Sequence, residues 1–202
     1  MPLTAFAINC TLKPSPAPSS CDLLLRQVAQ ALQHHSVAME IVRVADCNIK
    51  PGVRSDEGVG DDWPGIRRKI LAADIFILGT PIWLGHPSSL CQRVLERMDA
   101  FLGETDDAGR MVSYDRVGGV AVVGNEDGAH HVSAELFQGL NDVGFTLPAS
   151  AVTYWVGEAM HGTDYQDLPK TPEKTGKATE GLAANCVHLA GLLQRHRYPA
   201  AG

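Results

Sequence analysis

The segment IFILGTPIWLGHPSSLCQRVLERM, residues 75–98, decides the fold class. Residues 75–79 form a continuous apolar run of strand length, which is typical of a strand covered on both faces of a parallel sheet. After a loop over residues 80–89, apolar side chains recur at helical spacing through Leu90, Cys91, Val94, Leu95 and Met98. A buried strand followed by an amphipathic helix is the repeating unit of an α/β fold.

The same pattern recurs on both sides of this segment. Further strands are expected at residues 3–9, 37–44, 117–123 and 149–155. Helices are expected from residue 20 or 21 onward, at 66–72, at 132–143 and around 182–193. The connection over residues 46–65 is rich in Gly, Asp and Pro and shows no period, so it is expected to be a surface loop. Five β-then-α units predict an open parallel sheet with helices on both faces.

Composition places the chain among globular proteins. Its 202 residues are 45% hydrophobic and 20% charged, enough for one core, so a single domain over 1–202 is expected. The 17 Lys+Arg against 23 Asp+Glu form no basic cluster, which argues against a nucleic-acid partner.

The expected location follows from the start of the chain and from its cysteines. Residues 1–4 lack the pattern of a secretory signal, and no window is apolar enough to span a bilayer. Five cysteines without a C-x-x-C spacing signal no disulfide framework, and a reducing, cytoplasmic location is expected.

Ligands of open α/β sheets bind at the carboxyl ends of the strands, so the strand-end loops carry the functional prediction. The loop after the first strand, NCTLKPSPAPSS at residues 9–20, offers hydroxyls at Thr11, Ser19 and Ser20, a cation at Lys13 and the free amides of the next helix. This inventory suits a phosphate dianion. It contains neither a Walker loop nor a glycine-rich dinucleotide fingerprint, and a simple capped helix after a proline-rich loop is the alternative.

The loop after the third strand carries large apolar side chains where a surface loop is normally polar. Its residues are Pro81, Ile82, Trp83, Leu84 and Gly85. A planar apolar ligand could cover them, and Gly85 would allow close approach of a backbone N–H. In the alternative interpretation, Ile82 and Trp83 only cap the core.

The loop after the fourth strand, Gly124, Asn125, Glu126, Asp127 and Gly128, places amides and carboxylates before a helix. In the alternative interpretation, Glu126 and Asp127 are simply acidic residues in the first turn of the helix, where they interact favourably with the helix dipole.

Two histidine pairs do not predict a metal site. His130 and His131 are neighbours, so on a helix they point about 100° apart and cannot chelate one ion together. The same holds for His34 and His35. Solvated or hydrogen-bonded histidines are expected, and no metal ligand is assigned.

Together, the three loops resemble the flavodoxin-like NAD(P)H-dependent FMN reductase family. The resemblance is carried by TPIWLGHPSSL with its helix ending in RMD (80–99), and by GNEDGAHH (124–131) with LNDVGF (140–145). It implies a three-layer doubly wound fold whose five parallel strands have the order 2-1-3-4-5. It also implies that FMN binds with its phosphate in the loop 11–20, its isoalloxazine edge on 81–85, and 124–128 closing the other side. Cys10 and the PSPAP stretch depart from the shorter G-S-x-R-type turn of many relatives.

The implied activity is transfer of a hydride from NADH or NADPH to FMN, and of electrons onward to a quinone, a nitro or azo compound, or free flavin. Because the flavin carries this chemistry, no catalytic side chain is assigned. A backbone N–H near Leu84 or Gly85 is expected to face the flavin N5. The resemblance also implies a homodimer or homotetramer, with Trp155, Glu158 and Met160 bordering a neighbour's flavin. The alternatives are a flavodoxin-type electron carrier and a relative that has lost FMN.

Overall fold

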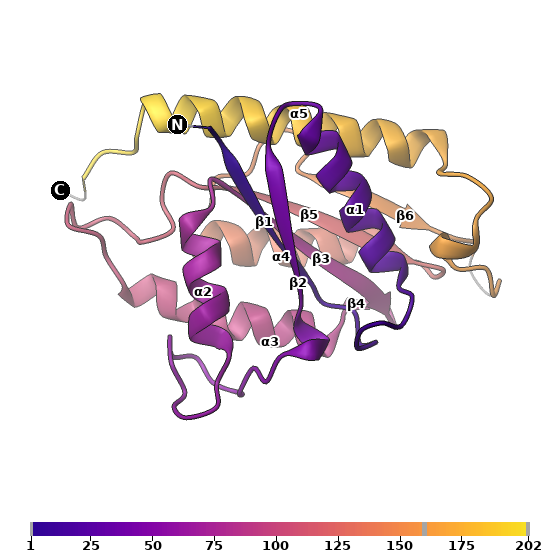
Figure 1. The fold of residues 1–202 in the computed structure, drawn as a ribbon, viewed down its shortest axis with the longest axis horizontal. Coiled ribbons are helices and arrows are strands. Elements are labelled where there is room, and N and C mark those ends of the chain that lie inside the picture. The colour runs from indigo at the N-terminus through magenta and orange to yellow at the C-terminus, as the bar shows by residue number, and fades with distance from the viewer. Residues whose placement is uncertain (1, 159–160, 201–202) are drawn as a thin grey trace.

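The structure is a computed structural model that describes residues 2–158 and 161–200, and it is built on a twisted sheet (Figure 1). The parallel strands run in the order β2-β1-β3-β5-β6. Their bounds are β1 Thr4–Asn9, β2 Ala38–Arg43, β3 Ile75–Trp83, β5 Val117–Gly124 and β6 Val152–Val156. A two-residue strand, β4 (His86–Pro87), pairs antiparallel with β3 beside this path. Without β4, the order is the expected 2-1-3-4-5, so the doubly wound fold class is confirmed.

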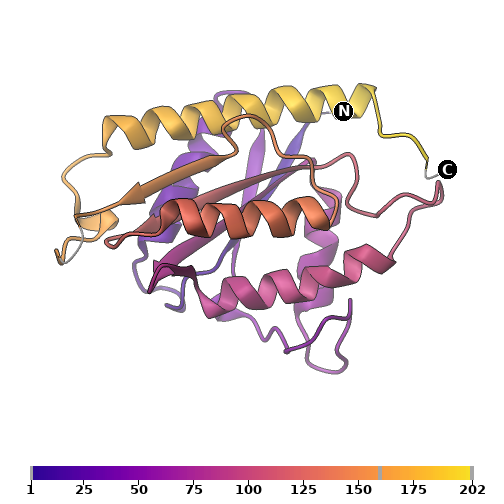
Figure 2. The same ribbon diagram turned by 180° about the vertical axis from the view of Figure 1, so that it is seen from behind.

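Five helices cover the two faces of this sheet. They are α1 Ser20–Gln33, α2 Trp63–Ala72, α3 Ser89–Met98, α4 Ala129–Asp142 and α5 Glu173–Arg195, with 3-10 turns at Val44–Asp46, Asp99–Gly103 and Tyr165–Asp167. Helices α1 and α5 pack on one face, and α2, α3 and α4 pack on the other. Figure 2 shows α3 and α4 crossing in front of the sheet. Within the part of the chain that is described, no helix is both long and apolar enough to cross a membrane.

Alternation along the strands divides the core between the two helical layers. In β1, Phe6 and Ile8 face α2, α3 and α4, whereas Ala5 and Ala7 face α1 and α5. Successive side chains of a strand point to opposite faces, so a doubly covered strand is apolar throughout.

The segment after the expected third strand differs from the prediction. Residues 80–83 were expected in a loop, but they continue β3, and Trp83 pairs with His86 in a hairpin. Leu84 and Gly85 form the two-residue turn with φ of 52° and 78°. Positive φ at both positions is the geometry that matches the twist of a tight hairpin. This hairpin exposes Trp83 and Leu84, at 52% and 89%, whereas Ile82 stays buried in the core as the alternative interpretation expected.

The long connection before α2 lacks regular structure, as predicted, but a buried ion pair fixes its shape. Arg97, on α3, is fully buried and donates hydrogen bonds to the carbonyls of Lys50 (2.9 Å) and Arg54 (2.8 Å). It also donates to Asp61 Oδ2 at 2.7 Å, and neither side chain is exposed to solvent. Helix α2 starts at Trp63, three residues before the predicted start, with Pro64 in its first turn.

Candidate functional site

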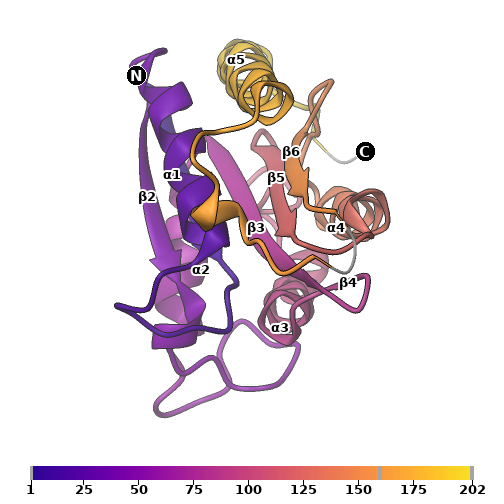
Figure 3. The ribbon, with the colours of Figure 1, turned by 90° about the vertical axis from the view of Figure 1, so that its right-hand side faces the viewer.

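The three loops singled out in the sequence meet at one end of the sheet. Figure 3 looks toward this end, where the chain leaves β1, β3 and β5. Two hollows lie here: an inner cavity of about 140 Å³ and an outer cleft of about 740 Å³. The chain passes from one to the other between Trp83 and Leu84, and again between Asn125 and Glu126.

Every residue expected to bind the cofactor lines one of these hollows. The inner cavity is lined by Thr11, Lys13, Ser19, Ser20, Pro81, Ile82, Trp83, Gly124 and Asn125. The outer cleft is lined by Leu84, Gly85, Glu126, Asp127 and Gly128. The topology thus brings together three segments that are far apart in the sequence.

The first loop is folded around its own polar groups. Thr11 is buried, its N–H donates to Asn9 Oδ1 at 3.0 Å, and its hydroxyl accepts from the Lys13 N–H at 3.3 Å. Ser19 caps α1 and accepts from the Asp22 N–H at 3.4 Å. Ser15 lies elsewhere, because its hydroxyl donates to Asp46 at 2.6 Å. Thr11, Ser19 and Ser20 of this loop therefore line the inner cavity, whereas Ser15 does not.

The acidic residue in the first turn of α1 is neutralised by two arginines. Asp22 accepts from Arg26 at 2.7 Å and pairs with Arg43 at 3.3 Å. Burial alone would raise the pKa of Asp22, but these guanidinium groups outweigh it and lower that pKa. Arg43 also donates to the Ala17 carbonyl at 2.8 Å and so shapes the loop. The helix N-terminus keeps its positive end available for an anion.

The hairpin and the loop after β5, residues 124–128, are in direct contact at the boundary of the two hollows. The Leu84 N–H donates to Glu126 Oε1 at 2.8 Å. Gly128 has φ of 119°, and a Cβ placed there would lie 2.8 Å from the Gly85 Cα. Glu126 thus accepts a hydrogen bond from the Leu84 N–H, which together with the Gly85 N–H was expected to face the flavin N5.

An aromatic wall that was not assigned to this site completes the inner cavity. Trp155 and Tyr165 line it with ring centroids 5.3 Å apart, and the Tyr165 hydroxyl donates to Gln27 at 2.6 Å. Asp164 also lines it and accepts from the Asn125 side chain at 3.0 Å. Trp155 is the penultimate residue of β6, so the rule that pointed to the other strand ends could have found it. Tyr165 and Asp164 follow an aperiodic segment and carry no such signal.

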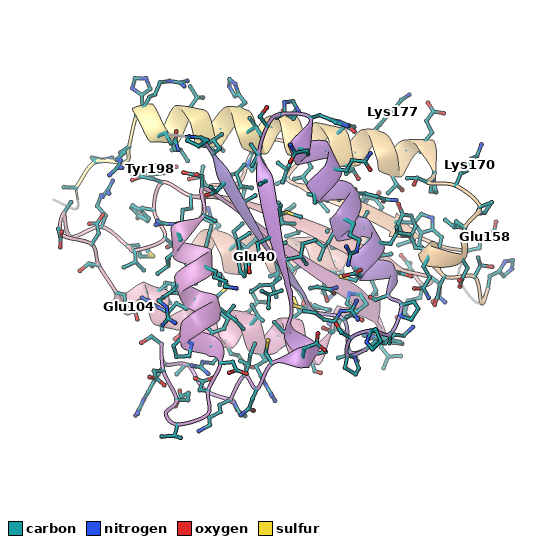
Figure 4. The ribbon with its side chains drawn as sticks, in the orientation of Figure 1. Glu40, Glu104, Glu158, Lys170, Lys177 and Tyr198 are labelled. Carbon is teal, nitrogen blue, oxygen red and sulfur yellow. The ribbon has the colours of Figure 1, made fainter. Side chains whose placement is uncertain are left out.

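The residues expected to border a neighbouring subunit fall in different places. Trp155 lines the inner cavity of its own chain. Glu158 lies at the outer edge of the molecule with its side chain 82% exposed, where it pairs with His161 at 3.1 Å (Figure 4). Met160 lies outside the described residues.

Thiols near the site are held in their neutral form. Cys21 lines the inner cavity, and burial raises its pKa above the ordinary value. Cys10, at the end of β1, is also buried, and its pKa is raised by burial and by Cys91. A thiol rather than a thiolate is a poor nucleophile, so neither group suits covalent catalysis at neutral pH.

The donor set fits a phosphorylated planar ligand. Hydroxyls, a lysine and the N-terminus of α1 line the inner cavity together with the apolar rings of Trp83 and Trp155. A cavity of about 140 Å³ is smaller than the roughly 300–1,000 Å³ typical of small-molecule sites. A ligand of FMN size would therefore extend past the hairpin toward the outer cleft.

Comparisons with curated proteins give two relatives. A divalent metal cation transporter, MntH, of Mycobacterium bovis is 36% identical over 98% of this chain, which spans 30% of that relative's length. The 8-demethyl-8-aminoriboflavin-5'-phosphate synthase of Streptomyces davaonensis is 32% identical over 98% of this chain and 81% of its own length.

Solved structures of flavin proteins resemble this chain in fold. The crystal structure of RosB with the bound intermediate 8-demethyl-8-formylriboflavin-5'-phosphate has a TM-score of 0.88 and 31% identity, covering 97% of this chain and 82% of that one. A Streptococcus pneumonia flavodoxin has a TM-score of 0.59 at 12% identity, covering 92% and 98%, and supports the fold alone. The family model for NADPH-dependent FMN reductase matches residues 4–161. The chain therefore belongs to the NADPH-dependent FMN reductase family, whose members are flavin-dependent oxidoreductases with a flavodoxin-like fold.

Proposed function

We propose that this protein binds FMN across the inner cavity and the hairpin, and uses it to move electrons from NADH or NADPH to a small-molecule acceptor. The observation that carries the proposal is that one cavity is lined both by polar groups, at Thr11 and Lys13, and by the rings of Trp83 and Trp155. This polarity matches a molecule with a phosphate at one end and a flat ring at the other.

Each part of the chain has a separate task in this proposal. The loop 11–20 holds the phosphate through hydroxyls and the amides of α1. Trp83 is 52% exposed and offers its ring as a surface for the isoalloxazine. The Leu84–Glu126 hydrogen bond fixes the hairpin beside the ring edge. When bound, FMN supplies the chemistry, which is acceptance of a hydride and release of electrons.

The outer cleft is the proposed place for the nicotinamide and the acceptor, which would use it in turn. Its opening toward solvent suits exchange of one small planar molecule for another. Quinones, nitro or azo compounds and free flavin are the acceptor classes proposed. We also propose that the chain forms a single domain, and that it acts in the cytoplasm as a homodimer or homotetramer.

Stopped-flow absorbance of the FMN-loaded protein mixed with NADPH, and separately with NADH, tests this function. Bleaching of the flavin absorbance by either nucleotide, followed by recovery on adding a quinone, is the expected result. Binding of FMN without any bleaching would overturn it in favour of a flavodoxin-type electron carrier. Failure to bind FMN at all would indicate a relative that has lost the cofactor.

A second candidate treats the flavin as substrate. The relative from Streptomyces davaonensis is named as a synthase of an aminated riboflavin phosphate, and the RosB structure holds a formylated one. Identity of 31–32% over nearly the whole chain supports the comparison. Mass spectrometry of FMN after incubation with the protein distinguishes the two functions, because a reductase returns FMN with its mass unchanged.

A further inference from the structure

We propose that His86, His131 and Glu135 form a binding site for a divalent transition-metal ion such as Zn²⁺. One ligand atom from each residue lies within 4.8 Å of the other two. Glu135 Oε1 is 2.7 Å from His131 Nε2 and 3.3 Å from His86 Nδ1. The three side chains thus converge on one point.

The fold brings these residues together from two separate elements. His131 and Glu135 are four residues apart on α4, so they lie on the same side of the helix. His86 comes from β4, on the hairpin that packs against the start of α4. His131 does not pair with its neighbour His130, whose ring contacts Tyr154 instead at 3.1 Å. His130 and His131 do not chelate one ion together, as expected from their adjacent positions, and the hairpin supplies His86 as the partner of His131.

The distances suit a small tetrahedral ion. Metal–ligand bonds of about 2.0–2.2 Å place neighbouring ligand atoms roughly 3.3–3.6 Å apart. The His86–Glu135 distance of 3.3 Å falls there, and the shorter His131–Glu135 contact must widen slightly. Both histidine side chains are more than half exposed, at 64% and 56%, so they can turn to adjust. The ring centroids of the two histidines are 5.0 Å apart at 78°, so the rings do not stack over the point of convergence.

The ligand chemistry selects the class of ion. Two imidazoles and one carboxylate suit Zn²⁺, Co²⁺, Ni²⁺ or Cu²⁺, whereas Ca²⁺ and Mg²⁺ prefer all-oxygen sites. Three protein ligands leave a fourth position open, as in catalytic zinc sites. His86 and His131 line the outer cleft, so that position is accessible to water or to an anionic oxygen of a molecule in the cleft.

The ion would join the hairpin to α4. The Leu84–Glu126 hydrogen bond and the Gly85–Gly128 contact already hold the same two segments near Gly85. A metal on His86 would add a third connection, at histidines that line the outer cleft and not the inner cavity. Metal binding itself does not depend on the proposed function, although this consequence for the flavin site does.

Isothermal titration of the metal-stripped full chain with Zn²⁺ tests the site. The expected result is one equivalent bound, with affinity reduced at least tenfold in His86→Gln and in His131→Gln. The matched control, His130→Gln, changes the neighbouring cleft histidine and should keep wild-type Zn²⁺ affinity. Co²⁺ in place of Zn²⁺ should give visible d–d absorption in wild type that is lost in both ligand variants.

Two results would overturn the site: no stoichiometric Zn²⁺ binding by wild type, or equal affinity in the double variant of His86 and His131. Circular dichroism verifies that each variant is folded, and His86→Gln, in an exposed hairpin, still decides the question if His131→Gln does not fold. FMN titration of the same samples separates this outcome from the proposed function, since wild type can bind FMN with no metal site, or Zn²⁺ with no FMN.

Discussion

The backbone N–H of Leu84 donates to the Glu126 carboxylate at 2.8 Å, joining two loops 42 residues apart in the sequence. Leu84 is held there in a left-handed conformation, with φ of 52°, which costs roughly 1–2 kcal/mol for a residue with a Cβ. The hairpin turn is therefore fixed from outside as well as by Gly85. This contact connects the carboxyl ends of β3 and β5, on which the proposed flavin site depends.

Replacing Glu126 should loosen this turn. Glu126→Ala removes the acceptor of a charge-assisted hydrogen bond, worth about 1.5–3 kcal/mol when well formed. The contact is exposed, which favours the lower end of this range, so FMN should bind about tenfold more weakly. Glu126→Gln keeps an acceptor oxygen and should stay within a few-fold of wild type. Fluorescence titration with FMN measures both, and equal affinity for all three proteins would contradict a positioning role.

Gly128 is expected to tolerate no side chain. Its φ of 119° disfavours other residues, and a Cβ would lie 2.8 Å from the Gly85 Cα, a backbone atom that cannot turn aside. Gly128→Ala should lower the melting temperature and push the hairpin away from the loop after β5.

Gly85→Ala is the matched control for this change. Gly85 also has positive φ, at 78°, but a Cβ there meets nothing within 4 Å. Only the conformational cost of about 1 kcal/mol is expected. Thermal unfolding of both variants checks the prediction, and a larger loss in Gly85→Ala than in Gly128→Ala would refute the close contact.

Lys13 should act on the phosphate of FMN and not on its ring. Lys13→Ala should weaken FMN binding several-fold while leaving riboflavin, which lacks the phosphate, almost unaffected. Ser15→Ala is the control within the same loop, because the Ser15 hydroxyl is bound to Asp46. Paired titrations with FMN and riboflavin measure the difference. A loss of the same size for both ligands would place Lys13 away from the phosphate.

Some features of this site could be predicted from sequence, because strand ends in a parallel sheet share one edge. Thr11, Trp83 and Gly124 each follow an apolar run, so their convergence follows from topology. The hairpin turn could not be predicted, since it depends on Glu126 reaching Leu84 across the fold. Tyr165 was missed for a similar reason, because its position depends on contacts with Trp155 and Gln27.

Arg97 shows a similar limit in the fold itself. It lies in the helix whose apolar residues include Leu95 and Met98. The hydrophobic periodicity of that helix predicts that an arginine lies on the solvent-exposed face. The structure buries it completely, because Asp61 and the carbonyls of Lys50 and Arg54 surround the guanidinium. The long connection has no periodic signal, so these partners have no local signature.

The Arg97–Asp61 pair makes stability depend on pH. Burial opposes ionisation of Asp61, but hydrogen bonds from Arg97 and from backbone amides outweigh it and lower its pKa to about 2. Because the folded pKa lies below the unfolded value of about 3.9, the stabilisation is complete above that value and is lost as pH falls toward 2. Asp61→Asn should cost about 3 kcal/mol at pH 7, since it leaves Arg97 buried without a countercharge.

Urea unfolding of wild type and Asp61→Asn across pH measures this dependence. The difference in unfolding free energy should be constant from pH 7 to about 5, and it should shrink below about pH 4. A difference that grows on acidification would show that Asp61 does not carry the charge in the folded state.

The most direct test of the account is titration of the purified, ligand-free protein into FMN, followed by flavin fluorescence. We predict quenching that saturates at one FMN per chain, with riboflavin binding more weakly because it lacks the phosphate held near Thr11 and Lys13. Unchanged FMN fluorescence at every ratio of protein to flavin would contradict the central claim that these strand ends bind the cofactor.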